Sequence, residues 1–231
     1  MQSAPFSINN THYSYRTLEG SDSVHIKGAS IVFAYSSTVE IIIDNDQVIT
    51  LPEKSFLELP PCSRIAYTLE RKGYVVILTN EQLQPLSNLL QLKSLESEAY
   101  EVTKPWGREL WLTGKSPKYS MVLKLIEIKK GTKTSLQVHR FKYESNFLCQ
   151  GEAIFRHSEE KYRGKEFNYT IEEVKISAPT VIDVEPMTIH QVEAFTDIIL
   201  IEASTDYLED VIRLQDDTGR QDGKVESEHA G

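Results

Sequence analysis

The sequence predicts an all-β protein that contains two copies of one β-barrel module, and three observations lead to this fold class. Short apolar or alternating runs, each typical of a strand, recur along most of the 231 residues between Gly, Asn, Asp, Pro and Ser. Leucines fall near helical spacing in one segment, residues 83–95. The order of strands and turns in residues 55–79 returns in residues 180–204, which favours an internal duplication.

The first module is assigned to residues 1–80, where six runs predict strands. These runs are residues 30–35, 38–45, 47–51, 55–60, 64–70 and 73–79. A linker follows at residues 81–101. Its leucines predict one short helix, whose start is restricted by Pro85.

The second module is assigned to residues 102–220, where the strand pattern resumes. Its predicted strands are residues 109–113, 119–129, 134–140, 145–157, 167–176, 180–185, 190–195 and 197–204. The last residues, 221–231, are polar and contain Gly. We therefore expect a disordered tail there, with His229 in it rather than in a ligand set.

The two copies differ at the positions where chemistry is expected. Aligning their proline turns places Ile65 or Arg64 opposite His190, and neither side chain can act as a neutral imidazole ligand. Glu40 is the one carboxylate at a comparable place in the first copy. We therefore predict that the first barrel binds no metal and serves packing, dimerisation or the shape of the other site.

Composition excludes several classes of protein. The formal net charge of −9 with scattered Lys and Arg argues against a nucleic-acid partner. The start of the chain has no pattern of a signal peptide, and no run approaches the ~18 apolar residues of a membrane span. Cys62 and Cys149 lie far apart and are expected to be free thiols. We expect a cytosolic protein that does not bind membranes.

The most informative stretch is residues 131–151, which predicts a β-hairpin with metal-ligating residues. Side chains two apart on a strand share a face, so Gln137 and His139 are expected to point inward together. Phe141 is the next residue on that face, and Glu144 opens the second strand of the hairpin. Oxygen and nitrogen donors gathered in this way, with His190 from the later repeat, can hold a divalent metal.

Four separate segments of the second module resemble the cupin superfamily, and more closely the cupin domain of type II mannose-6-phosphate isomerases. They are KPWGREL at residues 104–110, the run at 119–144 with its Ser-Leu-Gln-x-His pattern, VIDVEPMTIHQVEA at 181–194, and the run at 202–220 ending in Asp-Asp-x-Gly-Arg. The resemblance covers residues 102–220, about half of the chain. It implies a jelly-roll type barrel and, with the repeat, a bicupin.

The resemblance also implies a ligand set. Many cupins have His-x-His in the first motif, whereas Phe141 stands at the second of these positions here. The isomerase likeness implies instead that Gln137, His139, Glu144 and His190 hold the metal. Zinc is the metal that we expect first, and Mn or Fe would accept the same donors.

Two further residues are candidates for catalysis. Lys124 alternates with leucines in residues 119–129, so it can face the barrel interior and pair with Glu144 or grip a phosphate. Arg213 lies in the C-terminal segment of the resemblance and can contact a phosphate or enediolate, or else fix the tail through a salt bridge. Lys104 and Arg108 could bind an anion, although solvated charges are the commoner outcome.

The leading hypothesis is an aldose–ketose isomerase of a phosphorylated sugar, acting through an enediolate. A second is another cupin reaction on a sugar or nucleotide-sugar, either epimerisation or an oxygen-dependent reaction at iron. A third is a carbohydrate-binding bicupin without catalysis. Each implies a small-molecule partner, and we expect a homodimer.

Overall fold

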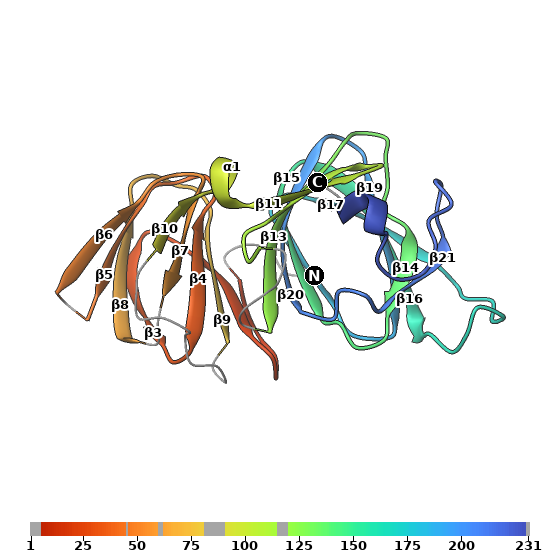
Figure 1. Ribbon diagram of the computed structural model, residues 1–231, viewed down its shortest axis with the longest axis horizontal. Coiled ribbons are helices and arrows are strands. Elements are labelled where there is room, and N and C mark those ends of the chain that lie inside the picture. The colour runs from red at the N-terminus through yellow and green to blue at the C-terminus, as the bar shows by residue number, and fades with distance from the viewer. Residues whose placement is uncertain (1–5, 45, 60–61, 81–90, 115–119, 230–231) are drawn as a thin grey trace. The chain divides into compact units, whose positions relative to one another are not determined.

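The computed structural model describes residues 6–44, 46–59, 62–80, 91–114 and 120–229, and the chain divides into two compact units (Figure 1). One unit comprises Ala4–Tyr100 with Leu112–Leu123, and the other comprises Glu101–Trp111 with Lys124–Gly231. Both are built almost entirely from antiparallel strands. The all-β class predicted from the sequence is therefore confirmed.

The N-terminal unit contains two sheets. One has the strand order β1-β2-β9-β4-β7-β10, and the other has the order β3-β8-β5-β6. The bounds are β1 (Ser7–Asn9), β2 (Ser14–Leu18), β3 (Ser21–Ile26), β4 (Ala29–Ala34), β5 (Val39–Ile43), β6 (Gln47–Leu51), β7 (Ser55–Leu59), β8 (Cys62–Leu69), β9 (Val75–Asn80) and β10 (Gln91–Ser94), followed by the short helix α1 (Leu95–Glu98).

Alternation of apolar and polar residues explains why these segments form strands with one buried face. In β5, Val39, Ile41 and Ile43 are buried, whereas Glu40 is exposed. The buried set joins apolar residues from both sheets, such as Val32 of β4, in one core. Strand β4 is buried along its whole length, as expected for a strand in the interior of a sheet.

All six strands predicted in the first module are present, but the sequence analysis missed β1, β2 and β3. These segments read SIN, SYRTL and SDSVHI and have few apolar residues in sequence, so they gave no strand pattern. Leucines 83, 86, 89 and 90 of the expected linker helix lie outside the described residues. Residues 91–94, also assigned to the linker, pair instead with β7, and α1 is four residues long.

The C-terminal unit also contains two sheets, with the orders β11-β12-β13-β20-β15-β18 and β17-β16-β19-β14-β21. The bounds are β11 (Tyr100–Lys104), β12 (Gly107–Trp111), β13 (Met121–Ile128), β14 (Leu136–His139), β15 (Glu144–Gln150), β16 (Glu152–Lys161), β17 (Glu172–Ser177), β18 (Thr180–Val184), β19 (Thr188–Ala194), β20 (Ile198–Thr205) and β21 (Val211–Gln215). Apolar residues of both sheets, including Phe155 and Leu200, form one core between them.

The C-terminal segment has more structure than the sequence suggests. Glu226–His229 form a 3-10 helix, η1, and His229 is only 8% exposed, with its ring edge-to-face against Trp111 at 5.6 Å between centroids. This differs from the disordered tail that we expected from residue 221 onward, because a polar composition does not reveal a single anchoring histidine. Cys149 is a buried thiol, as expected, and its Sγ atom donates to the carbonyl oxygen of Ile199 at 3.3 Å, while the side chain of Cys62 lies outside the described residues.

Within the described ranges, no helix has the length and apolar character needed to cross a bilayer.

Candidate metal centre

Strands of the C-terminal barrel share one pattern on the face that points into the barrel. Each carries a charged or imidazole side chain near one end and at least one apolar core residue two or four positions away. The members of this pattern are Lys124 with Ile126 and Ile128, Glu144 with Leu148, His190 with Val192 and Ala194, and Glu202 with Leu200 and Ile198. The barrel interior is therefore apolar in one part and polar in the other.

The polar part brings three of the predicted ligands together. The Nε2 atom of His139 lies 3.4 Å from Oε1 of Glu144, and the Nε2 atom of His190 lies 3.2 Å from Oε2 of the same carboxylate. The donor atoms of all three residues lie within 4.8 Å of one another, and all three side chains are buried. They come from β14, β15 and β19, which belong to both sheets of the barrel.

The other ring nitrogen of each histidine is held by an oxygen acceptor. The Nδ1 atom of His139 lies 2.8 Å from Oδ1 of Asp210, and the Nδ1 atom of His190 lies 3.0 Å from the carbonyl oxygen of Thr188. An acceptor at this position favours the tautomer with the proton on Nδ1, which leaves the lone pair of Nε2 directed at Glu144. Both imidazoles are thus oriented as metal ligands usually are.

The electrostatics of the cluster favour the neutral form of His139. Burial lowers the pKa of His139, and this effect outweighs the opposing influence of Glu144 and the hydrogen bond to Asp210. Burial alone would raise the pKa of Glu144, but the neighbouring Lys142, His139 and His190 hold it well below its usual range. An ionised carboxylate beside a neutral imidazole is the protonation state that a metal ion requires.

Gln137 lies beside the cluster of His139, Glu144 and His190, but its amide group forms hydrogen bonds of its own. Its Nε2 atom is 3.3 Å from Nε2 of His139, and its Oε1 atom accepts a hydrogen bond of 2.8 Å from the Ser135 hydroxyl. Gln137 is also the register partner of His190 across β14 and β19. Exchanging the amide oxygen and nitrogen would direct the oxygen toward the cluster, because Ser135 can accept as well as donate.

Phe141 does not occupy the inward position that the sequence spacing suggested. Strand β14 ends at His139, and the backbone N–H of Phe141 donates to Oδ2 of Asp210 at 2.7 Å instead of continuing the strand. The Phe141 side chain is 59% exposed and contacts Tyr207, with 5.6 Å between ring centroids. It therefore does not fill the ligand cluster.

A chain of buried ion pairs leads away from Glu144, and the sequence analysis missed most of it. The signs alternate at every step, and every side chain is at most 11% exposed. In order, the members of this ion-pair chain are Glu144, Lys142, Glu202, Lys124, Glu109, Lys104, Glu228, Arg220 and Asp216. The signal that could have revealed it is a charge placed inside an otherwise apolar strand, as at Lys124 and Glu202.

The ion-pair chain stabilises the charged forms of its members. Burial alone would lower the pKa of Lys142, but Glu144 and Glu202 raise it well above its usual range. Burial would raise the pKa of Glu109, but Lys124 and Lys104 lower it to about 2. Because the ion-pair chain begins and ends with a carboxylate, it holds five carboxylates and four cations, so one negative charge is in excess.

The two predicted catalytic residues lie in different surroundings. Lys124 faces the interior but pairs with Glu109 at 3.3 Å and Glu202 at 3.5 Å, and its Nζ lies 4.4 Å above the Trp111 ring. Lys142, rather than Lys124, pairs with Glu144. Arg213 lies opposite Gln137 in the register of β21 and β14 and donates through Nη1 to backbone carbonyls of residues 221 and 223.

Comparisons with solved structures identify the fold of the chain, whereas comparisons of sequence identify no family. No family model and no curated protein matches the chain. Among solved structures, oxalate decarboxylase from Bacillus subtilis, a protein with Mn(II) centres, is 12% identical with a TM-score of 0.59, over 87% of this chain and 70% of that chain. A putative glyoxylate-induced protein from Pseudomonas aeruginosa is 10% identical with a TM-score of 0.61, over 87% and 78%.

A third structure, AerE from Microcystis aeruginosa, is 11% identical with a TM-score of 0.58, over 88% of this chain and 97% of that chain. At such low identity the likeness shows the fold alone. None of these three is described as a mannose-6-phosphate isomerase, so that part of the predicted resemblance stays a prediction. The chain therefore shares the fold of these three structures, which supports the fold class that the sequence predicted.

Proposed function

We propose that this protein is a metal-dependent cupin enzyme, and that its reaction is the isomerisation of a phosphorylated aldose and ketose. The observation that carries the proposal is the buried cluster of His139, Glu144 and His190, with a protonated Lys142 beside Glu144. Gln137 is the proposed fourth ligand, through its amide oxygen. The cytosolic location and the homodimer inferred from the sequence remain predictions.

The donor atoms fit a divalent metal. Two ligand atoms that each lie about 2.1 Å from one metal ion are about 3.0 to 3.4 Å apart in octahedral or tetrahedral geometry. The separations of 3.2 and 3.4 Å between the histidine nitrogens and the Glu144 oxygens match this range. The ion-pair chain carries one negative charge in excess, and a cation bound beside Glu144 would balance this charge.

When bound, a divalent metal would act as a Lewis acid toward the carbonyl and hydroxyl oxygens of a sugar. Zinc, manganese and iron all accept imidazole and carboxylate ligands, and the donor distances do not separate them. Zinc is the conventional choice for this donor set, while the Mn(II) centres of Bacillus subtilis oxalate decarboxylase show manganese on the same fold. Metal analysis decides between them.

Lys142 is the residue that we propose to stabilise negative charge on the reacting oxygens. Isomerisation moves a proton between adjacent carbons through an enediolate, whose oxygens carry negative charge. The raised pKa of Lys142 keeps its ammonium group charged at neutral pH, so it suits a hydrogen-bond donor to the enediolate oxygen and not the base that takes the carbon-bound proton. Lys124, the earlier candidate, is separated from Glu144 in the ion-pair chain by Glu202 and Lys142.

Arg213 is proposed to bind the phosphate group or the developing anion. It shares a row with Gln137 and His190 across β21, β14 and β19, and directly opposite residues point to one face. Its Nε atom is buried and has no hydrogen-bond partner among the described residues. An unpaired guanidinium N–H in this row could be satisfied by an anionic substrate.

The proposal is tested by metal content and turnover in matched histidine variants. We expect His139→Ala and His190→Ala to lose bound metal and all turnover in a screen of hexose and pentose phosphates, because each removes a ligand. His25→Ala, at an exposed position of the N-terminal unit, is the control. Full activity in His139→Ala, or metal-loaded protein without turnover on any sugar phosphate, would exclude the isomerase.

The role of Lys142 is tested separately. Lys142→Arg keeps the charge and is expected to retain the fold and the metal, but to lower kcat by about 100-fold or more because the donor atom is displaced. Lys161→Arg, an exposed ion-paired lysine of β16, is the control. Unchanged kcat in Lys142→Arg would remove Lys142 from the reaction while leaving the metal centre intact.

The same experiments address the rival functions. Two histidines and one carboxylate are also the ligand types of non-haem iron enzymes, so bound iron with oxygen uptake would favour an oxygenase. Interconversion of nucleotide-sugars would favour an epimerase. Carbohydrate binding without turnover and without metal would favour a non-catalytic bicupin.

A further inference from the structure

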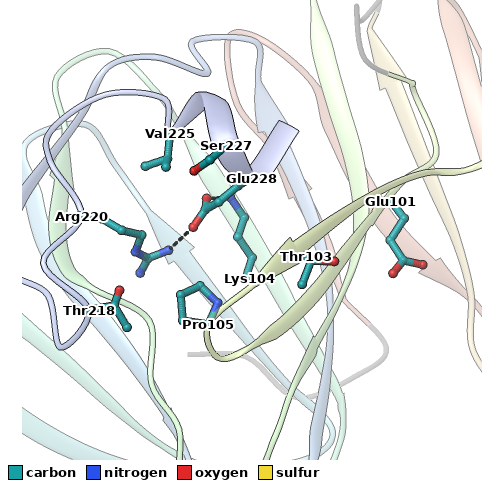
Figure 2. A pocket seen from close by; sticks show the side chains of 9 residues that line it. All are labelled: Glu101, Thr103, Lys104, Pro105, Thr218, Arg220, Val225, Ser227 and Glu228. Atoms are coloured by element: carbon teal, nitrogen blue, oxygen red, sulfur yellow. Dashed lines mark hydrogen bonds and ion pairs between the residues drawn. The ribbon is translucent and has the colours of Figure 1, made fainter. Parts of the chain in front are cut away.

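A cavity of about 600 Å³ lies in the C-terminal unit beside the end of the chain, and none of its lining residues belongs to the proposed ligand set (Figure 2). Its volume falls within the range of small-molecule sites. Residues of β11, of the loop after β21 and of η1 line it: Glu101, Thr103, Lys104, Pro105, Thr218, Arg220, Val225, Ser227 and Glu228. The cavity is therefore a candidate site of its own.

Two partly buried cations meet at one carboxylate in this cavity. Nζ of Lys104 donates to Oε2 of Glu228 at 2.7 Å, and Nη1 of Arg220 donates to Oε1 of Glu228 at 3.2 Å (Figure 2). The side chains of Lys104 and Arg220 are 10% and 11% exposed. Each oxygen of one carboxylate thus satisfies one cation, which is the arrangement that binds an oxyanion.

Both cations are held in place by other partners as well. Asp216 accepts from Nε and Nη2 of Arg220 at 3.0 and 2.6 Å, which leaves Nη1 directed at Glu228. Lys104 has Glu109 as its second partner at 3.7 Å. If Glu228 moves away, the two cations keep their positions, and the place of its carboxylate becomes a preformed anion site.

The rest of the lining suits a polar ligand. Thr103, Thr218 and Ser227 contribute hydroxyl groups, which can donate or accept hydrogen bonds. Glu228 itself belongs to η1, a single 3-10 turn, so its side chain can leave the cavity by rotation about its own bonds. The cavity combines two cations, three hydroxyls and two carboxylates, which are Glu228 between the cations and Glu101 of β11.

We propose that this cavity is a second binding site, for a small organic anion that carries a phosphate or carboxylate group. Glu228 occupies the anion position until the ligand's oxyanion replaces it between Lys104 and Arg220. This site shares no residue with the proposed metal ligands and takes no part in the proposed isomerisation.

Inorganic phosphate and acetate are the probes, titrated by calorimetry into the full chain. Glu228→Gln removes the competing charge and keeps the shape of the side chain. Glu226→Gln is the control, because Glu226 lies on the same turn with its side chain 80% exposed. We expect Glu228→Gln to bind phosphate about tenfold to hundredfold more tightly than the wild type and Glu226→Gln, as one or two hydrogen bonds to charged groups imply.

Two further variants locate the bound anion. Adding Lys104→Met to Glu228→Gln should abolish the gain, whereas adding Lys161→Met, at an exposed lysine of β16 outside the cavity, should leave it. A stronger response to phosphate than to acetate indicates a phosphate ligand, and the reverse indicates a carboxylate. Equal phosphate affinity in Glu228→Gln and Glu226→Gln, or a gain that survives Lys104→Met, would overturn the proposal.

Thermal unfolding covers the case in which Glu228→Gln is unstable. Phosphate should then raise its Tm, or restore its folding, by more than it stabilises Glu226→Gln, because the bound anion supplies the missing charge. An unstable Glu228→Gln that responds to phosphate no more than Glu226→Gln would show that Glu228 is only a structural counter-ion.

Discussion

Asp210 connects the backbone of the β14–β15 turn to the candidate metal centre. One of its oxygens lies 2.8 Å from Nδ1 of His139, and the other accepts from the backbone N–H groups of Phe141 and Lys142 at 2.7 and 3.0 Å. Burial would raise the pKa of Asp210, but these hydrogen bonds and His139 lower it, so the carboxylate stays ionised. A single residue therefore fixes both the imidazole and the turn.

Replacing Asp210 by Asn should weaken metal binding without removing a ligand. The amide keeps the size of the side chain but loses the charge that orients the imidazole, so metal affinity is expected to fall by about 10-fold to 100-fold. Competitive metal titration measures this change. Asp206→Asn, at an exposed position between β20 and β21, is the control, and equal affinities in the two variants would refute the role of Asp210.

The hydrogen bonds and lowered pKa of Asp216 predict that the stability of the folded protein depends on pH. It accepts five hydrogen bonds, from the backbone and side chains of Thr218 and Arg220. Burial would raise its pKa, but Arg220 and Thr218 hold it far below the usual range. Because the folded pKa lies below the unfolded value of about 3.9, the stabilisation is complete above that value and is lost as the pH falls through the folded pKa.

We therefore expect Asp216→Asn to unfold more easily than the wild type at pH 7, by about 2 kcal/mol. The difference should shrink progressively below about pH 4, where the wild type also loses this contribution. Denaturant unfolding at a series of pH values measures it. Asp217→Asn is the control, since Asp217 is 58% exposed and forms an ion pair with Lys133 at 3.3 Å. A constant difference from pH 7 to pH 2 would contradict the assignment.

The spacing of residues in the sequence indicated the candidate ligands, but it did not indicate the side chains that surround them. Alternation along one strand placed Gln137 beside His139, and the structure does bring them within 3.3 Å. Lys142 could not be placed in this way because it follows the end of β14, where alternation no longer holds. Its position depends on Asp210, which lies 68 residues later in sequence.

Among the elements, β14 shows how a side chain can end a strand. The sequence suggested a strand through residue 140, with Phe141 next on the inner face. The structure ends β14 at His139, where the carbonyl oxygen accepts from Met187 and the next N–H groups turn to Asp210. A competing carboxylate from a distant loop is not visible in local sequence, so this boundary could not be predicted.

Strand β12 depends on a glycine at its first residue. Gly107 has φ of +153°, and a Cβ atom there would lie 1.9 Å from the carbonyl oxygen of Glu127 on β13. Any side chain would therefore force the two strands apart.

We expect Gly107→Ala to lower the free energy of unfolding by about 2 to 4 kcal/mol. Gly131→Ala is the matched control, because Gly131 also has positive φ, of +75°, but no atom within 4 Å of its Cβ position. Backbone strain alone should lower the free energy of unfolding of Gly131→Ala by about 1 kcal/mol. Equal losses in the two variants, measured by denaturant unfolding, would show that close strand contact is not the reason for Gly107.

Most strands were predictable because their apolar residues alternate, as in β5, or form a continuous run, as in β4. The strands that were not predicted include β1 to β3, β11 and β21. Strands β1 to β3 have mixed sequences that acquire a buried face only through pairing, as β2 does with β9. These strands depend on tertiary contacts, and the pattern of a single sequence does not contain that information.

At the scale of the whole molecule, the chain divides into two compact units with two sheets each. Leu112–Leu123 group with the N-terminal unit, whereas the sequence analysis assigned them to the second module. The candidate metal centre, the ion-pair chain and the proposed anion site all belong to the C-terminal unit. We therefore expect metal binding to stabilise one unit and not the other.

Hydrogen–deuterium exchange of the full chain, combined with elemental analysis, tests this central claim most directly. We predict one divalent metal per chain, and slower exchange in β14, β15 and β19 when metal is added to metal-free protein. At a metal concentration 100 times its Kd, the added protection is about 2.7 kcal/mol, while exchange in residues 6–80 is unchanged. No bound metal, or protection confined to residues 6–80, would contradict the account.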